Sequence, residues 1–179
     1  MSDLEGELDA LASETGFSGV VRIDQGDGIE LARAYGLAHR AFEIPNAVDT
    51  RFGLASGAKG FTALAVHLPV RGSGDGGIYS TAADISSFWQ AFFAGRIVST
   101  GWVAEMVRAR SDAPKHSKRY GLGFWLHAST DAVILEGCDA GVSFRSVHDP
   151  RTQVTLTVIS NTAEGAWPIA RYLQNAASS

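Results

Sequence analysis

The tetrapeptide Ser56-Gly57-Ala58-Lys59 has residue types and a spacing that suit acyl transfer. A serine at the start of a helix exposes its hydroxyl, and its own backbone N–H lies at the positive end of the helix dipole, where an oxyanion is stabilised. A lysine three residues later lies on the same helix face. A neutral amine there accepts the serine proton, provided that burial or nearby cations disfavour its charged form. The pattern predicts a Ser–Lys nucleophile.

A second interpretation of these residues involves no chemistry. Ser56 is then the cap of a helix and Lys59 a solvated side chain. Ser-x-x-Lys is short and arises by chance in many proteins. The rest of the chain therefore has to decide between the two interpretations.

The composition of the chain excludes several classes of protein. The 179 residues, 45% hydrophobic and 19% charged, predict one folded domain spanning residues 1–179. The net charge of −4 gives no basic field for nucleic acid or a membrane surface. One cysteine and five scattered histidines exclude an intrachain disulfide and predict neither a metal nor a cofactor. No leader-like start and no run of 18 apolar residues occur, so we expect a cytoplasmic protein.

Hydrophobic periodicity predicts the elements that must position Ser56 and Lys59. Glycine-rich and proline-containing turns separate short β-rich runs, which predicts antiparallel pairing. Helices before and after these runs predict an α+β fold, an antiparallel sheet flanked by helices. The expected helices cover 2–15, 55–66, 82–94, 100–107 and 167 onwards, and the expected strands cover 18–24, 29–35, 120–127, 132–137, 142–148 and 154–160. The basic cluster Lys115–Arg119 is expected to be a solvated loop.

Further motifs follow one another along most of the chain. They are Phe17–Val21, Thr50–Val66 around Ser56, the Gly-Gly-x-x-Ser-Thr-Ala-x-Asp pattern of Gly76–Ile85, and Tyr-Gly-Leu-Gly-Phe-Trp at Tyr120–Trp125. Together they resemble the serine β-lactamase and penicillin-binding-protein family, in its class C, D-Ala-D-Ala carboxypeptidase and esterase branch. The resemblance implies a sheet with flanking helices, Ser56 as nucleophile beside Lys59, and a small-molecule acyl substrate.

The second motif of that family is missing from the chain. The family carries Tyr-x-Asn or Ser-x-Asn on a helical subdomain, and neither pattern occurs in this sequence. The resemblance therefore implies an internal deletion between about Val66 and Arg71, and the loss of the group that passes a proton to the leaving group. Tyr79 and Tyr120 are candidates for an auxiliary role, although tyrosine is also a common strand residue.

The third motif of the family is altered. Leu135-Glu136-Gly137 stands where the family has Lys-Thr-Gly or His-x-Gly, so leucine replaces the cation that holds a substrate carboxylate. A neutral ester or amide then fits better than a penicillin. By the same resemblance Gly137 is a substrate-binding residue, and the backbone N–H of Cys138 joins that of Ser56 in the oxyanion hole. Asp139 is a candidate substrate contact, or else an ordinary turn residue.

Three functional hypotheses remain open at this stage. The first is a serine hydrolase that forms an acyl-enzyme on an ester or amide. The second is a catalytically weak or inactive truncated member that acts as a binding module or minimal scaffold. The third is a site completed between two chains, because loss of the subdomain leaves apolar surface that favours a homo-oligomer. The aromatic stripe Phe88, Trp89, Phe92 and Phe93 is expected in the core, with some of it exposed if the subdomain is absent.

Overall fold

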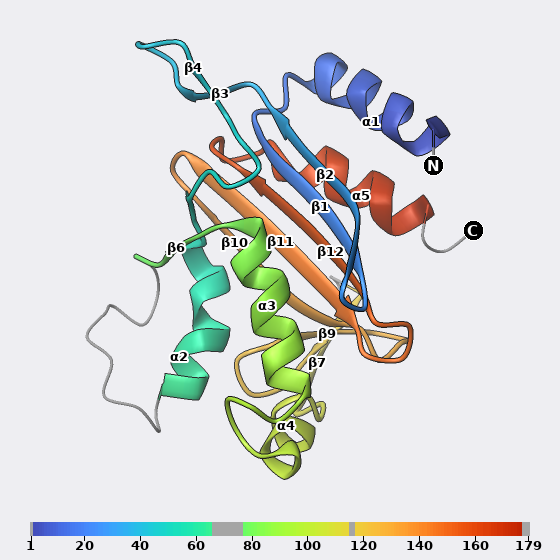
Figure 1. Cartoon of the computed structure of the whole chain (residues 1–179). Helices are drawn as coiled ribbons and strands as arrows, with labels where there is room; N and C mark the ends of the chain where they lie inside the picture. Colours follow the sequence, from blue (N-terminus) through green and yellow to red (C-terminus); the bar gives the residue numbers. More distant parts are fainter. Residues whose placement is uncertain (1, 66–76, 115–116, 177–179) are drawn as a thin grey trace.

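A computed structural model describes residues 2–65, 77–114 and 117–176. Its centre is an eight-stranded sheet in the order β2-β1-β12-β11-β10-β9-β8-β7, with antiparallel pairing between neighbours and helices against its two faces (Figure 1). The predicted α+β class, an antiparallel sheet flanked by helices, is confirmed. No helix in the described ranges is long and apolar enough to cross a membrane.

The strands of the large sheet are β1 (Gly19–Gln25), β2 (Gly28–Tyr35), β7 (Ser111–Ala113), β8 (Lys118–Tyr120), β9 (Trp125–His127), β10 (Val133–Asp139), β11 (Val142–Asp149) and β12 (Val154–Ser160). The two small sheets pair β3 (Leu37–His39) with β4 (Ile44–Pro45), and β5 (Phe52–Gly53) with β6 (Tyr79–Ser80). The helices are α1 (Ser2–Thr15), the short 3₁₀ helix η1 (Ala55–Ala58), α2 (Lys59–Ala65), α3 (Ala82–Phe93), α4 (Thr100–Met106) and α5 (Ala166–Ala176).

The first and last strands join the two ends of the chain, because β1 pairs with β12. Successive side chains of a strand point to opposite faces, so this strand pair contributes side chains to the hydrophobic cores on both faces of the sheet. Val20 and its partner Ile159 lie in the core beneath α3, whereas Val21 and its partner Val158 lie in the core beneath α1 and α5. Both faces of the sheet are therefore buried at this strand pair.

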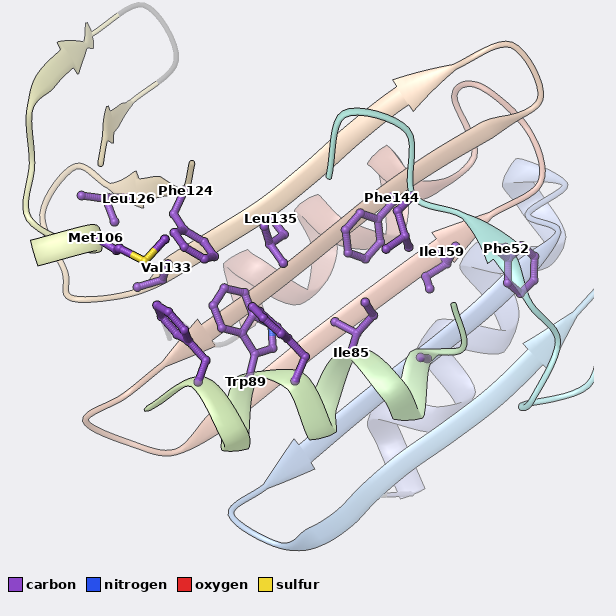
Figure 2. Close-up of a cluster of buried hydrophobic side chains, with 14 of the residues drawn as sticks. Phe52, Ile85, Trp89, Met106, Phe124, Leu126, Val133, Leu135, Phe144 and Ile159 are labelled. Atoms are coloured by element: carbon purple, nitrogen blue, oxygen red, sulfur yellow. The ribbon is translucent and has the colours of Figure 1, made fainter. Parts of the chain in front are cut away.

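Helix α3 anchors the core next to the candidate site (Figure 2). It begins with a capping box, in which Thr81 and Asp84 exchange side-chain and backbone hydrogen bonds. Trp89 is fully buried, and its indole N–H donates to Ser146 Oγ at 2.9 Å. Phe92 is equally buried, so the aromatic stripe belongs to the core, as expected.

The strand predicted over residues 120–127 is a hairpin instead. β8 ends at Tyr120 and β9 begins at Trp125, and these two residues pair across the turn. The turn closes with a hydrogen bond from Gly121 N to Phe124 O at 2.9 Å, and Gly123 adopts a φ of +84° that favours glycine. The prediction of one strand was wrong because the two glycines provide a turn that hydrophobic periodicity does not reveal.

The segment that follows α2 falls outside the described residues. The predicted end of the helix at Val66 and the expected deletion between Val66 and Arg71 both lie there, and so do residues 115–116 of the basic cluster. The deletion therefore stays a prediction.

Candidate active site

The connection between β5 and α2 brings Ser56 and Lys59 together. Ala55, the first residue of η1, adopts a φ of +45°, an uncommon conformation for a residue with a side chain. Lys59, the first residue of α2, donates a hydrogen bond from Nζ to Ser56 Oγ at 2.6 Å. Ser56 is half-buried and Lys59 is exposed. The distance suits proton transfer between a nucleophile and its base.

At Gly137, strand β10 packs against the backbone of Ser56, the candidate nucleophile. A Cβ atom on Gly137 would lie 2.5 Å from the backbone nitrogen of Ser56 and 2.4 Å from Leu54 O, so a larger residue would push η1 away. Gly57 packs as closely, because its Cβ would meet the Phe144 ring at 2.5 Å. The two glycines let η1 lie directly on β10 and β11.

A cavity of about 490 Å³ opens beside this pair. That volume is in the range of small-molecule sites. Ser56 and Lys59 form one side of it, and residues from β7 to β10 form the other: Ser111, Ala113, Tyr120, Gly123, Trp125, Ile134, Leu135 and Glu136. Most of this opposite wall is apolar, so the space beside the candidate nucleophile suits an apolar acyl or leaving group.

Of the two auxiliary candidates, the structure places Tyr120 at the cavity. Its ring packs edge-on against Trp125, with the ring centroids 4.7 Å apart. Burial raises the pKa of Tyr120 above its usual value, so the hydroxyl stays protonated at neutral pH and is available as a donor. Tyr79 lies on β6, is 71% exposed, and is not among the residues that line the cavity.

Cys138 and Asp139 lie at the end of β10, outside the cavity lining. The Cys138 Sγ donates to Ala163 O at 3.3 Å, and desolvation followed by the charges of Glu164 and Asp139 raises the pKa of this thiol. A thiol of raised pKa is a poor nucleophile. Asp139 Oδ1 accepts a hydrogen bond from Ala140 N at 2.7 Å, the contact of a turn residue. The role of the Cys138 backbone N–H in an oxyanion hole stays a prediction.

Sequence reasoning missed a charge cluster behind the cavity wall. Lys118 and Arg145 both form ion pairs with Glu136, and Arg145 does so at 2.9 Å. Lys118 belongs to β8 and its side chain is only 13% exposed, so the expectation of a solvated loop was wrong for this residue. Glu136 and Arg145 are cross-strand partners, a relation that depends on the β10–β11 register. Among the described residues, no group of His, Cys, Asp and Glu side chains could hold a metal ion.

Comparison with solved structures identifies the fold. No protein-family model and no curated protein matches the sequence. The penicillin-binding protein from Bacillus halodurans is similar with a TM-score of 0.83 and 16% identity, over 94% of this chain and 98% of that one. The octameric penicillin-binding protein homologue from Pyrococcus abyssi is similar with a TM-score of 0.78 and 12% identity, over 97% and 77%. The D-amino acid amidase from Ochrobactrum anthropi SV3, complexed with L-phenylalanine amide, is similar with a TM-score of 0.72 and 13% identity, over 99% and 100%.

These likenesses show that the chain has the fold of the penicillin-binding proteins and β-lactamases. Identities of this size carry the fold alone. The class C branch and the missing subdomain stay predictions from the sequence.

Proposed function

We propose that the chain is a serine hydrolase that forms an acyl-enzyme on an ester or amide. The observation that carries the proposal is the hydrogen bond from Lys59 Nζ to Ser56 Oγ at 2.6 Å beside a cavity of about 490 Å³. Two structural neighbours of the same fold are a penicillin-binding protein and a D-amino acid amidase, and the amidase supports acyl chemistry on an amide.

Each step of the reaction has a residue assigned to it. Ser56 Oγ attacks the carbonyl carbon while its proton passes to Lys59, and the backbone N–H groups of Ser56 and Cys138 stabilise the oxyanion. The tetrahedral intermediate collapses and expels the alcohol or amine, which takes the proton held by Lys59 while the Tyr120 hydroxyl donates a hydrogen bond to it. Water then attacks the acyl-enzyme as Lys59 accepts its proton, and that proton returns to Ser56 Oγ when the acid leaves, which restores the Ser56 hydroxyl.

The alternative is a catalytically weak or inactive member of this fold that binds small molecules without turnover. One observation favours it: Lys59 is exposed, whereas the base role calls for burial or nearby cations. Removing parts of such machinery leaves residual catalysis from the oxyanion hole and from binding, so slow acylation lies between the two functions.

We also propose that the chain self-associates. Phe42 and Ile44 lie 75% and 51% exposed on the β3–β4 hairpin, which projects from the body of the molecule (Figure 1). Large exposed apolar side chains of this kind favour protein contacts. The octameric penicillin-binding protein homologue has the same fold, which supports a second copy of this chain as the partner that binds the exposed hairpin.

Hydrolysis of an activated aryl ester tests the proposed activity. The Ser56→Ala variant is expected to lose the ester hydrolysis of the unaltered chain. Ser87→Ala is a matched control, because Ser87 is an exposed serine of α3 outside the cavity lining. Equal rates in Ser56→Ala and the unaltered chain would contradict the proposal.

A further inference from the structure

A second cavity lies on the α5 face of the sheet, opposite the face that Gly137 turns towards Ser56. Its volume is about 580 Å³, which is in the range of small-molecule sites. Strands β10, β11 and β12 form its floor, and α5 forms one wall through Leu173. Neither Ser56 nor Lys59 lines it, so its ligand need not be a substrate.

The floor of the second cavity is an apolar row that crosses three strands. Ile134 pairs with Val147, and Val147 pairs with Leu156, so the three side chains point to one face of the sheet. Ile134 is 3% exposed, whereas Val147 and Leu156 are half-buried. The apolar side chains that line this cavity are all aliphatic. Such a floor suits an aliphatic chain, which gains free energy when it leaves water.

A charged row runs beside the apolar row on the same face. Two positions further along each strand, Glu136 pairs with Arg145, and Arg145 pairs with Val158. Lys118 Nζ donates to Glu136 Oε1, and Arg145 Nε donates to Oε2 at 3.1 Å. The three charged side chains are 13% to 18% exposed, so water screens them weakly. Two cations meet one carboxylate, so this row keeps a net positive charge.

A smaller cavity connects the charged row with the apolar row. Its volume is about 270 Å³, and it shares Ile134, Val147 and Arg145 with the second cavity. Lys118 also lines it. An anionic group in this smaller cavity would lie beside both cations while an attached chain covered the apolar row.

The charges on the other side of the apolar row offset each other. Asp149, which pairs with Val154, accepts hydrogen bonds from the backbone nitrogens of Arg151 at 2.8 Å and Thr152 at 3.4 Å. Burial opposes the charged form of Asp149, but these hydrogen bonds outweigh burial and lower its pKa. Asp149 therefore stays charged at neutral pH and balances Arg151. The charges thus favour one orientation of an anionic ligand, with its head beside Lys118.

We propose that the second cavity binds an aliphatic carboxylate of the fatty-acid type, with its chain over Val147 and its carboxylate beside Lys118 and Arg145. Charge complementarity selects this occupant, because the carboxylate meets the net positive charge and the chain covers the apolar row. The inference does not depend on the proposed hydrolase function, since the second cavity and Ser56 lie on different faces of the sheet.

Isothermal titration calorimetry with two ligands of equal chain length tests the charge preference. Sodium decanoate carries a carboxylate, and decyltrimethylammonium carries a cation on the same alkyl chain. Decanoate is expected to bind the unaltered chain about tenfold or more tightly than the cation does, because its head contacts two weakly screened cations. Equal affinities, or no binding of decanoate, would overturn the inference.

The variant Val147→Phe tests where the chain of the ligand lies. The added ring fills part of the second cavity, so decanoate binding is expected to weaken about tenfold or more. Val48→Phe is a matched control, because Val48 is 47% exposed and lines neither cavity. Its affinity for decanoate is expected to stay unchanged. Unchanged binding in folded Val147→Phe would place the ligand elsewhere and contradict the inference.

Removal of one cation tests where the carboxylate lies. Arg145→Gln is expected to weaken decanoate binding about tenfold and to leave the binding of decyltrimethylammonium no weaker. Arg33→Gln is the control, because it removes the same charge from an ion pair with Glu5 that joins α1 to β2. Lys118→Gln takes the place of Arg145→Gln if circular dichroism shows that the latter is unfolded. An equal loss in Arg33→Gln, or no loss in the folded cation variant, would contradict the inference.

A second copy of the chain is the competing occupant of the second cavity. If it covers the cavity, Val147→Phe lowers the mass measured by light scattering, and the unaltered chain does not bind decanoate. That result would overturn the inference. Ser56→Ala is expected to bind decanoate as tightly as the unaltered chain does, so a failure of the proposed hydrolase function is distinguishable from a failure of this inference.

Discussion

Ser56 and Lys59 share one hydrogen bond, and the proposed chemistry depends on the direction in which its proton moves. A serine attacks a carbonyl only as its proton leaves, and Lys59 Nζ is the group that contacts Ser56 Oγ. The contact alone is also what a helix-start serine with a neighbouring lysine would show. The base role therefore has to be tested separately from the contact.

Lys59→Arg separates the base role from the contact. Arginine keeps the positive charge and the hydrogen-bond donors but does not deprotonate in proteins, so it cannot serve as a base. We expect Lys59→Arg and Lys59→Ala to slow acylation of Ser56 by about 10²- to 10⁴-fold. The measurement is the second-order rate of ester hydrolysis in each variant. Full activity in Lys59→Arg would show that Lys59 only holds Ser56 in position.

The sequence predicted these two residues because their chemistry and their spacing are local. The Lys118–Glu136–Arg145 cluster lay beyond the same reasoning, because its members come from three strands and meet through the sheet register. Gly137 was predicted as a substrate contact. Its close approach to the Ser56 backbone is a packing relation that becomes visible only once η1 lies on β10.

At the scale of elements, α3 and the sheet enclose a histidine. His148 of β11 is 2% exposed, and its ring stacks on Phe93 and Trp89 with centroids 4.8 Å and 5.7 Å away. Its Nδ1 is 2.9 Å from Thr155 Oγ1, and within the described part of the chain Nε2 has no hydrogen-bond partner. Burial, opposed by the charge of Asp149, lowers the pKa of His148 to about 4.

This buried histidine makes the stability of the fold depend on pH. The unfolded chain binds a proton near pH 6.5 and the folded chain only near pH 4, so the unfolded state holds more protons between these values. The stabilisation is complete above pH 6.5 and is lost as the pH falls towards 4. We expect a loss on the order of 3 kcal/mol in the free energy of unfolding.

Urea denaturation at pH 7, 5.5 and 4 measures this dependence. The variant His148→Gln keeps a polar side chain without the titration, and its free energy of unfolding is expected to vary less over the same range. An identical decline in both proteins would show that other groups cause the pH dependence.

The helices and strands were predicted correctly where the spacing of hydrophobic residues determines their type and bounds. The 2–15 helix, the first hairpin and strands β10 to β12 agree with the prediction within a few residues, because burial on the sheet faces fixes their pattern. The hairpin at β8 and β9 was missed, since Gly121 and Gly123 set its turn. The same turn brings Tyr120 and Trp125 to the cavity. Because the hairpin was not predicted, this part of the cavity wall could not be predicted either.

At the scale of the whole molecule, the exposed β3–β4 hairpin is where a second copy of the chain is expected to bind. We expect light scattering at micromolar concentration to give a mass above 18.9 kDa. The substitutions Phe42→Ser and Ile44→Ser, which remove the exposed apolar side chains, are expected to lower that mass without unfolding the chain. A strict monomer would rule out both the oligomer and a site completed between two chains.

The central claim is that Ser56 is an activated nucleophile, and a covalent probe tests it directly. A fluorophosphonate probe reacts with an activated serine, and peptide mass spectrometry locates the adduct. The proposed function predicts one adduct, on Ser56, in the unaltered chain and in Ser87→Ala, and no adduct in Ser56→Ala. An unlabelled Ser56 in the folded chain would contradict the proposal that this residue is the nucleophile.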